Sequence, residues 1–507
     1  MEEELPPEQR GGARPRRGRP GLPALHPAWI VTIGACAVLF RVAMASGLNN
    51  DVYWQLAAGN WMLGHHAVIR HDVFSYTVPG HPWFAEEWGF EVLLAWMVRH
   101  VGPVSYWLVS AGATSGALLL SAARCRRLGS GQLWTAALAI MVAGGLVIGV
   151  APRPQDLSYL FFAFELLTLT LARRDRRWLL ALPPLLLLWA NLHGSFLFGL
   201  AVFGFDVAAS AVARARQPGP AAPGGARELR VRGRVGVGAP LPARWGAASF
   251  AASLIAPVVN PHGLGLYRYA FHVGTTSKLN GIEEWQSPNF HDPVLLVFVA
   301  LPAVVAAVWL ASSRQRVELF DLVVWAVLLI ATLRAVRFGP YMVIALAGVL
   351  APWKVVPKET LRASRVAPLA ALALVALIVS PHHPPAGAPT TRGSGAVPVR
   401  AAAWLRAQGG RVFSTYVWND YLIHVGVPDF VDGRTDMYFG TGVLDTYTKV
   451  SSLSQAPDPV FDRYDVRWVL WPRGDALSTY LAQDPRWHVA RRFGPDLVFE
   501  RVSDHSQ

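Results

Sequence analysis

The sequence is poor in charged residues and almost lacks cysteine. Charged side chains make up 16% of its 507 residues, below the roughly 25% of a typical soluble domain, which argues against a wholly soluble protein. The two cysteines, Cys36 and Cys125, lie in or beside separate apolar blocks and imply neither a disulfide framework nor a zinc site. A glycine-rich phosphate loop is also missing, so we do not expect nucleotide binding.

The sequence is instead rich in long apolar blocks. Hydrophobic residues make up 53% of the chain. Many fall in blocks that approach the roughly 20 residues with which a helix crosses about 30 Å of hydrocarbon. They predict an all-α polytopic membrane domain with about eleven spans. The blocks are Ala28–Val42, Val104–Ala123, Leu133–Val150, Leu157–Ala172, Leu179–Leu192, Phe196–Val212, Trp245–Val259, Val294–Ala311, Leu319–Leu333, Pro340–Leu350 and Val366–Val379.

Basic residues indicate how the chain is oriented. The net charge of +13 comes from short Lys and Arg runs between apolar blocks, not from an aromatic and basic surface that would bind nucleic acid. With a cytoplasmic N-terminus and about eleven spans, every basic run falls inside and the C-terminal region falls outside. This orientation requires that Trp88–Val101, a short segment that carries Glu91, Arg99 and His100, does not cross. If it crosses, the sidedness inverts.

Composition also divides the chain into domains. Residues 401–501 alternate helical and strand patterns, which favours a small soluble α/β domain after the membrane domain. The strand patterns are Arg411–Tyr416, Phe430–Asp432, Trp468–Trp471, His488–Phe493 and Leu497–Arg501. The predicted parts are a disordered cytoplasmic tail (1–27), a transmembrane domain (28–380) with an external loop (47–103) and a cytoplasmic linker (213–243), a Pro-rich linker (381–398), and an extracytoplasmic domain (399–507).

Polar residues are concentrated where the outer ends of the spans are expected. Charged and amide groups are costly at membrane depth, so such residues mark a functional pocket by default. The inner face carries mainly Arg and Lys runs instead. The outer sets are residues 49–88 with Asp51, Glu86 and Glu87; Arg153–Asp156; Asn191–Gly194; Asn260–Pro288; and Arg334 with Arg337.

These motifs resemble those of the GT-C glycosyltransferase superfamily, polytopic enzymes that use polyprenyl-phosphate-linked sugars. The likeness covers nearly the whole chain after residue 28, and it is greatest to a group of bacterial membrane proteins of largely unassigned activity. The adjacent Asp-Asp or Asp-Glu pair of protein mannosyltransferases is absent, because Asn50 and Val52 flank Asp51. The matching segments are Asp51–Gly59, Pro82–Trp88, Arg153–Gln155, Asn191–Gly194, Asn260–Gly263, Glu284–Pro288 and Asp432–Arg434.

The resemblance implies an inverting enzyme that moves a hexosyl or pentosyl group from a polyprenyl-phosphate donor to a glycan, lipid or protein. It would act at the outer face of the bacterial cytoplasmic membrane. Asp51, just after the first span, is the candidate general base, with Glu86 or Glu87 as a second catalytic acid. The arginine guanidinium can donate two parallel hydrogen bonds to a phosphate. The candidates for binding the donor phosphate are therefore Arg153, Arg334 and Arg337. The substrate-binding candidates are Trp54, Asn191, His193, Asn260, His262, Glu284 and Trp285.

Other interpretations of the same residues stay open. Asp51 and the Glu86–Glu87 pair are also suited to cap the helices that follow them, and Asn260 is suited to a turn. Asp432, Arg434 and neighbouring acids form either an acceptor contact or a salt-bridged loop. We expect no cofactor and no metal centre from the spacing of ligand residues, and divalent-metal dependence stays open. The alternatives to an enzyme are a non-catalytic GT-C-like protein of glycan assembly or export, and a transporter.

Overall fold

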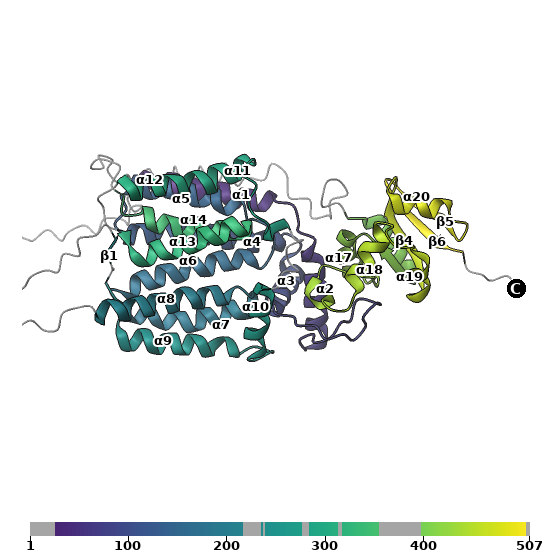
Figure 1. Ribbon diagram of the computed structural model, residues 1–507, viewed down its shortest axis with the longest axis horizontal. Coiled ribbons are helices and arrows are strands. Elements are labelled where there is room, and N and C mark those ends of the chain that lie inside the picture. Colours follow the sequence, from purple (N-terminus) through teal and green to yellow (C-terminus); the bar gives the residue numbers. More distant parts are fainter. Residues whose placement is uncertain are drawn as a thin grey trace, which may run out of the picture.

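The structure is a computed structural model that describes residues 26–215, 235–236, 239–275, 283–312, 317–353 and 397–502 (Figure 1). A bundle of long helices occupies one end of the molecule, and a small α/β unit occupies the other. Two helices, α2 (Asp51–His65) and α3 (Trp88–Val101), lie between them. The molecule therefore has three layers along its long axis.

The bundle is built from the predicted apolar blocks. Each predicted block lies in one or more of its helices, except Val366–Val379, which lies outside the described residues. The elements are α1 (Ala28–Ala45), α4 (Ser105–Arg127), α5 (Gln132–Val147), α6 (Gln155–Ala172), η1 (Arg176–Ala181), α7 (Leu182–Leu192), α8 (Phe196–Ala215), α9 (Ala243–Ile255), η2 (Ala256–Val258), α10 (Gly265–Thr275), η4 (Glu283–Trp285), α11 (Pro293–Leu295), η5 (Leu296–Ala300), α12 (Leu301–Ser312), α13 (Leu319–Arg334), η6 (Val336–Phe338) and α14 (Gly339–Leu350). Two short strands, β1 (Val235–Gly236) and β2 (Val317–Glu318), pair in parallel. They link the connection between α8 and α9 to the connection between α12 and α13.

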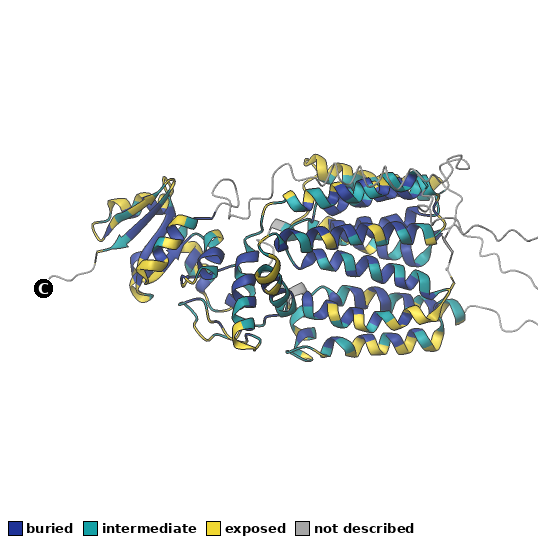
Figure 2. Cartoon of the chain, turned by 180° about the vertical axis from the view of Figure 1, so that it is seen from behind, coloured by how far each residue is buried: buried dark blue, intermediate teal, exposed yellow. Residues whose placement is uncertain are grey.

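The outer surface of the bundle is apolar, as in a protein that faces lipid. Among the described residues, four helical stretches are long and apolar enough to cross a membrane: α1, α4, α8 and the continuous Pro293–Ser312. Figure 2 shows exposed and half-buried positions along the outside of the bundle helices. Large apolar residues of these helices that are more than half exposed include Ile255, Val308 and Ile330. A soluble protein rarely exposes so much apolar surface. The bundle is a membrane domain, and the full count of about eleven spans remains a prediction.

Helices α2 and α3 pack closely on one another at the end of the bundle. A Cβ added to Gly59 of α2 would lie 2.9 Å from Cβ of Ala95, and closer still to the carbonyl oxygen of Glu91 on α3. Only glycine permits this approach. Helix α3 lies at the end of the bundle, next to the α/β unit (Figure 1). That it does not cross the membrane stays a prediction.

The C-terminal unit is a four-stranded mixed sheet with helices on it, as the alternating pattern predicts. The strand order is β3-β4-β6-β5, with β3 parallel to β4 and the other neighbours antiparallel. The strands are β3 (Arg411–Ser414), β4 (Val466–Pro472), β5 (Trp487–Phe493) and β6 (Asp496–Arg501). The helices are α16 (Val399–Gln408), α17 (Tyr416–His424), η7 (Thr435–Tyr438), α18 (Val443–Ser451), α19 (Asp458–Arg463) and α20 (Ala476–Gln483).

One predicted strand, Phe430–Asp432, is wrong. The segment does not join the sheet, and its neighbour Asp429 forms only an isolated bridge with Ser75 of the first loop. The Phe430 carbonyl accepts a hydrogen bond from Thr77 Oγ1 at 2.8 Å, so the backbone of this segment bonds to the loop. Its apolar side chains are buried in a core shared with that loop, which explains why the local pattern resembles a strand.

The first loop and the C-terminal unit form one hydrophobic core. Met62 and Trp83 from the first part of the chain are buried in the same cluster as Phe413 and Phe461 from the last part. Tyr76 also donates through its hydroxyl to the Val412 carbonyl at 2.8 Å. The unit is therefore fixed on the α2–α3 layer by continuous packing.

The Gly59 contact predicts an asymmetric response to alanine along α2. We expect Gly59→Ala to destabilise the protein by about 1–3 kcal/mol, because the new methyl group must displace the backbone of α3. The control is Gly64→Ala on the same helix, where no atom lies within 4 Å of the added Cβ; it should stabilise by about 0.4–1 kcal/mol. Thermal unfolding in detergent measures both, and equal effects would contradict the proposed α2–α3 constraint.

Candidate active site

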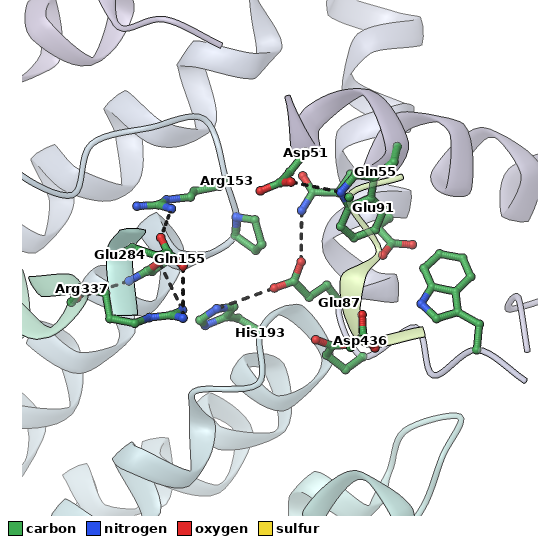
Figure 3. A pocket seen from close by; sticks show the side chains of 15 residues that line it. Asp51, Gln55, Glu87, Glu91, Arg153, Gln155, His193, Glu284, Arg337 and Asp436 are labelled. Carbon is green, nitrogen blue, oxygen red and sulfur yellow. Dashed lines mark hydrogen bonds and ion pairs between the residues drawn. The ribbon is translucent and has the colours of Figure 1, made fainter. Parts of the chain in front are cut away.

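A cavity of about 190 Å³ opens between the bundle, the first loop and the C-terminal unit (Figure 3). Each of the five predicted outer sets contributes a side chain to its wall, and so does the C-terminal unit. Loops that are far apart in the sequence therefore meet at one end of the bundle. The lining residues are Asp51, Trp54, Gln55, Trp83, Glu86, Glu87, Glu91, Arg153, Pro154, Gln155, His193, Glu284, Arg337, Gly433 and Asp436.

Two arginines share one carboxylate at one side of the cavity. Arg153, just before α6, forms an ion pair with Glu284, and Nη1 of Arg337 lies 3.2 Å from the other Glu284 oxygen. Although burial raises the pKa of Glu284, Arg337 and Arg153 together hold it below its ordinary value. The guanidinium of Arg337 also lies over the Trp285 ring, 4.3 Å from its centroid. Two positive charges against one negative charge leave this corner attractive to an anion.

Arg153 retains hydrogen-bonding capacity inside this corner. Its Nε atom is buried and has no hydrogen-bond partner among the described residues. A buried N–H without a partner is costly, and the cost disappears when a ligand oxygen accepts from it. Arg153 is thus oriented by Glu284 and still able to donate.

Asp51 is the first residue of α2, and it does not cap the helix. The residue at the cap position is Asn50, and no side-chain capping bond is formed there. The Asp51 carboxylate instead accepts a hydrogen bond from Trp54 Nε1 at 3.3 Å and lines the cavity (Figure 3). Burial raises the pKa of Asp51, and the Trp54 bond and Arg153 oppose that rise. The Asp51 side chain therefore does not cap α2, and the alternative interpretation of Asp51 as a helix cap is wrong.

Glu87 also faces the cavity rather than capping α3. It occupies the cap position of that helix without making a side-chain capping bond. One of its oxygens accepts from Gln55 Nε2 at 3.1 Å, and the other lies 3.7 Å from His193 Nε2. His193 in turn is held through Nδ1, which lies 2.8 Å from the Ser158 hydroxyl. Burial, followed by repulsion from Glu91 and Asp51, raises the pKa of Glu87 well above its ordinary value.

The segment Asp432–Asp436 of the C-terminal unit closes the cavity. Arg434 is fully buried and bonds both to Asp72 of the first loop, at 2.8 Å, and to Asp432, at 2.8 Å from Nε. Its guanidinium also lies over the Phe74 and Trp83 rings, 4.9 and 4.8 Å from their centroids. The two interpretations of this cluster thus apply to different members: Arg434 and Asp432 form a salt bridge, and Asp436 lines the cavity.

Gly433 brings the backbone of this segment into the cavity wall. Its N–H donates to Asp420 at 2.6 Å, and a Cβ added to it would lie 2.9 Å from both Asp420 Oδ2 and Trp54 Cδ1. No side chain fits between α17 and α2 at this point. The glycine therefore sets how closely the C-terminal unit approaches Asp51.

Several candidates from the sequence lie outside the cavity wall. Asn191 accepts from Trp88 Nε1 at 3.0 Å and donates to two backbone carbonyls, so it ties α3 to the bundle. Asn260 bonds within its own turn, and His262 stacks on Phe84 with ring centroids 3.8 Å apart. Trp285 and the exposed Arg334 do not line the cavity either. The structure assigns the two asparagines to holding loops in place.

Residues that the sequence analysis did not assign to a site role complete the wall. Gln55 follows Asp51 by one helical turn on α2, and Glu91 follows Glu87 by one turn on α3. Side chains four residues apart share a helix face, so this spacing is a signal that would have found both. Gln155 accepts from Arg337 at 3.5 Å. Asp436, two residues after the D-G-R motif, is one of the acids predicted to form either an acceptor contact or a salt-bridged loop, and it lines the cavity.

Comparison with solved structures identifies the fold. The chain is similar to the oligosaccharyltransferase AglB of Archaeoglobus fulgidus in complex with an inhibitory peptide and dolichol-phosphate, with a TM-score of 0.53, 12% identity, and coverage of 88% of this chain and 69% of that one. It is also similar to ArnT of Cupriavidus metallidurans bound to undecaprenyl phosphate, with a TM-score of 0.50, 14% identity, and coverage of 94% and 98%. No protein-family model matches the chain, and no curated protein matches it in sequence.

Both neighbours are polyprenyl-phosphate-dependent membrane glycosyltransferases of the GT-C superfamily. The expectation drawn from the sequence motifs is confirmed at the level of the fold: this chain has the GT-C fold, a helical membrane domain followed by a small α/β unit.

The buried ion network predicts that the C-terminal unit depends on Arg434. Arg434→Met leaves Asp72 and Asp432 buried without their cation, so we expect a loss of about 3–5 kcal/mol in unfolding free energy. The matched control is Arg467→Met, which removes the half-exposed partner of Glu500 on β4 and should cost at most about 1 kcal/mol. Thermal unfolding and protease sensitivity of the C-terminal unit report the difference. Equal effects would contradict a role for Arg434 in docking.

Proposed function

We propose that this protein transfers a glycosyl group from a polyprenyl-phosphate donor to an acceptor, with Asp51 as the general base. The positive-inside pattern predicts that transfer occurs on the extracytoplasmic face. The observation that carries the proposal is the meeting of a base-competent carboxylate with the Arg153–Glu284–Arg337 group in one cavity at the bundle end. The GT-C fold supports it, since AglB was solved with dolichol-phosphate and ArnT with undecaprenyl phosphate.

Asp51 would act on the acceptor. Its carboxylate takes the proton of the acceptor group as that group attacks the anomeric carbon of the donor sugar. Trp54 holds the carboxylate by a hydrogen bond to Oδ1, and the carboxylate lines the cavity that the acceptor would enter. Because a base works only when ionised, the raised pKa of Asp51 moves the acid limit of activity to higher pH than for an ordinary aspartate.

The arginine corner would act on the leaving group. As the new bond forms at the anomeric carbon, the bond from that carbon to the phosphate oxygen breaks, and the electron pair leaves with the lipid phosphate. Negative charge therefore grows on the phosphate in the transition state. Arg153 and Arg337, already oriented by Glu284, stabilise that charge without having to reorganise. A single displacement of this kind inverts the anomeric configuration.

Two carboxyl variants test the catalytic assignment. In cells that lack the native protein, we expect Asp51→Asn to lower glycan production by about 10²–10⁴-fold at normal protein levels, because no base remains in place. Glu87→Gln is examined beside it. Asp445→Asn, on the exposed face of α18, is the control and should retain full production.

The outcomes separate the candidate functions. Full glycan production by both Asp51→Asn and Glu87→Gln contradicts the transferase and favours a non-catalytic assembly role. Loss in Glu87→Gln alone moves the base to Glu87, at the cap position of α3.

Binding of undecaprenyl phosphate tests the arginine corner independently of chemistry. Removing one charge-assisted contact costs about 1.5–3 kcal/mol, so Arg153→Gln and Arg337→Gln should each weaken binding roughly 10–100-fold. Arg334→Gln changes an exposed arginine at the same end of the bundle and should alter binding less than about threefold. Titration of the purified protein in nanodiscs measures all three. An equal loss in Arg334→Gln would mean that general surface charge, not the corner, attracts the lipid.

A further inference from the structure

The side of the cavity away from the arginines is a wall of carboxyl groups. We call Glu86, Glu87, Glu91 and Asp436 the acidic wall; all four line the cavity. Figure 3 shows Glu87, Glu91 and Asp436 on one side and Arg153, Glu284 and Arg337 on the other. The acidic wall is formed by residues at the start of α3 and by Asp436 of the C-terminal unit. It is therefore complete only when that unit is docked.

The acidic wall contains a carboxylate without a partner. Glu91 is 1% exposed, and neither of its oxygens has a hydrogen-bond partner among the described residues. A buried carboxyl group without a hydrogen-bond partner is costly, and a ligand that donates to it would remove that cost. The packing of Gly59 against the Glu91 backbone fixes this part of α3, so the side chain cannot withdraw by moving the helix.

Arg434, the buried cation of the C-terminal unit, is held mainly by other acids. It bonds through Nε and Nη2 to Asp72 and Asp432 and lies over the Phe74 and Trp83 rings, while its Nη1 has no hydrogen-bond partner among the described residues. The side-chain donor to Asp436 is neutral, the Tyr269 hydroxyl at 2.8 Å. Gln55, likewise neutral, serves Glu87. The wall thus presents more carboxyl groups to the cavity than there are cationic side chains bonded to them.

We propose that the acidic wall is a subsite for an ammonium group on the sugar that the enzyme transfers, so that the substrate is an amino sugar with a free amine. This inference rests on the proposed function, because it places the donor phosphate at the arginine corner and the ring between the two sides. A cavity of about 190 Å³ is smaller than typical ligand sites of roughly 300–1,000 Å³, so it suits one sugar ring rather than an extended chain.

An ammonium group fits this wall better than a metal ion. Among the described residues, no group of three or more His, Cys, Asp or Glu side chains is arranged to hold a metal. A primary ammonium has three donors and tolerates looser geometry than a divalent cation. Burial, followed by repulsion from neighbouring acids, raises the pKa of Glu86, Glu87 and Glu91. A cation in the cavity opposes that repulsion, which a neutral hydroxyl does not.

The test compares methyl glycosides that carry no phosphate and differ at one ring position, which holds an ammonium group, a neutral N-acetyl group or a hydroxyl. Methyl glucosaminide, methyl N-acetylglucosaminide and methyl glucoside are titrated into the full-length protein in nanodiscs. We expect the free amine to bind roughly tenfold more tightly than either neutral glycoside, since its hydrogen bonds are charge-assisted. Glu91→Gln should reduce that preference to less than about threefold, and Glu86→Gln provides a second variant should the first unfold. Asp445→Asn is the matched control that keeps the full preference.

The possible results are distinct. Equal affinity for the three glycosides, or no binding of the amine, overturns the inference and leaves the carboxyls as acceptors for hydroxyls. Binding of Mn²⁺ that is lost in Glu91→Gln, without amine preference, overturns it in favour of a metal site. Undecaprenyl phosphate is titrated into the same samples. If it binds while the amine preference is absent, only this inference fails; if it does not bind to the unmodified protein, the proposed function fails first.

Discussion

The buried cation of Arg434 is the constraint on which the site depends. A guanidinium with two carboxylates and two aromatic rings around it is too costly to expose partly, so the C-terminal unit is either fully docked on the first loop or not docked. Gly433 and Asp436 flank this cation and reach the cavity only in the docked arrangement. The membrane bundle alone would leave Asp51 in an open depression. Docking supplies the last wall and removes water from around the carboxyls, which strengthens every electrostatic interaction inside.

Charge is distributed unevenly within the enclosed space. Glu284 orients two arginines on one side, whereas Glu91 on the other side has no partner among the described residues. A ligand with one anionic end and one electron-poor or cationic part would match this polarity. Asp51 accepts its hydrogen bond from the neutral Trp54 indole, and Arg153 acts on it through charge alone. Arg153 therefore does not neutralise Asp51 completely. Acidic and basic side chains are therefore held on opposite sides of one small cavity.

Much of the fold was readable from the sequence because apolar length and helix formation are local properties. The blocks that predict spans became helices, and four of the five strand patterns became strands. The exception, Phe430–Asp432, failed because its apolar residues are buried against the distant loop around Tyr76. The same limit applies to the site. Asp51, Glu87, Arg153 and Arg337 were recognisable as costly polar groups at span ends, but whether Asn191 served a ligand or the Trp88 indole depended on tertiary contacts.

The core shared by the first loop and the C-terminal unit has a consequence for biogenesis. The hydrogen-bond acceptor of Tyr76 is the Val412 carbonyl, which lies 336 residues further along the chain. At roughly 5–20 residues per second, the ribosome needs on the order of half a minute to deliver it. During that time the apolar face around Trp83 and Met62 is uncovered. A chain interrupted before its last hundred or so residues would keep this face permanently exposed, so truncated products should be recognised by chaperones and membrane proteases as unfinished.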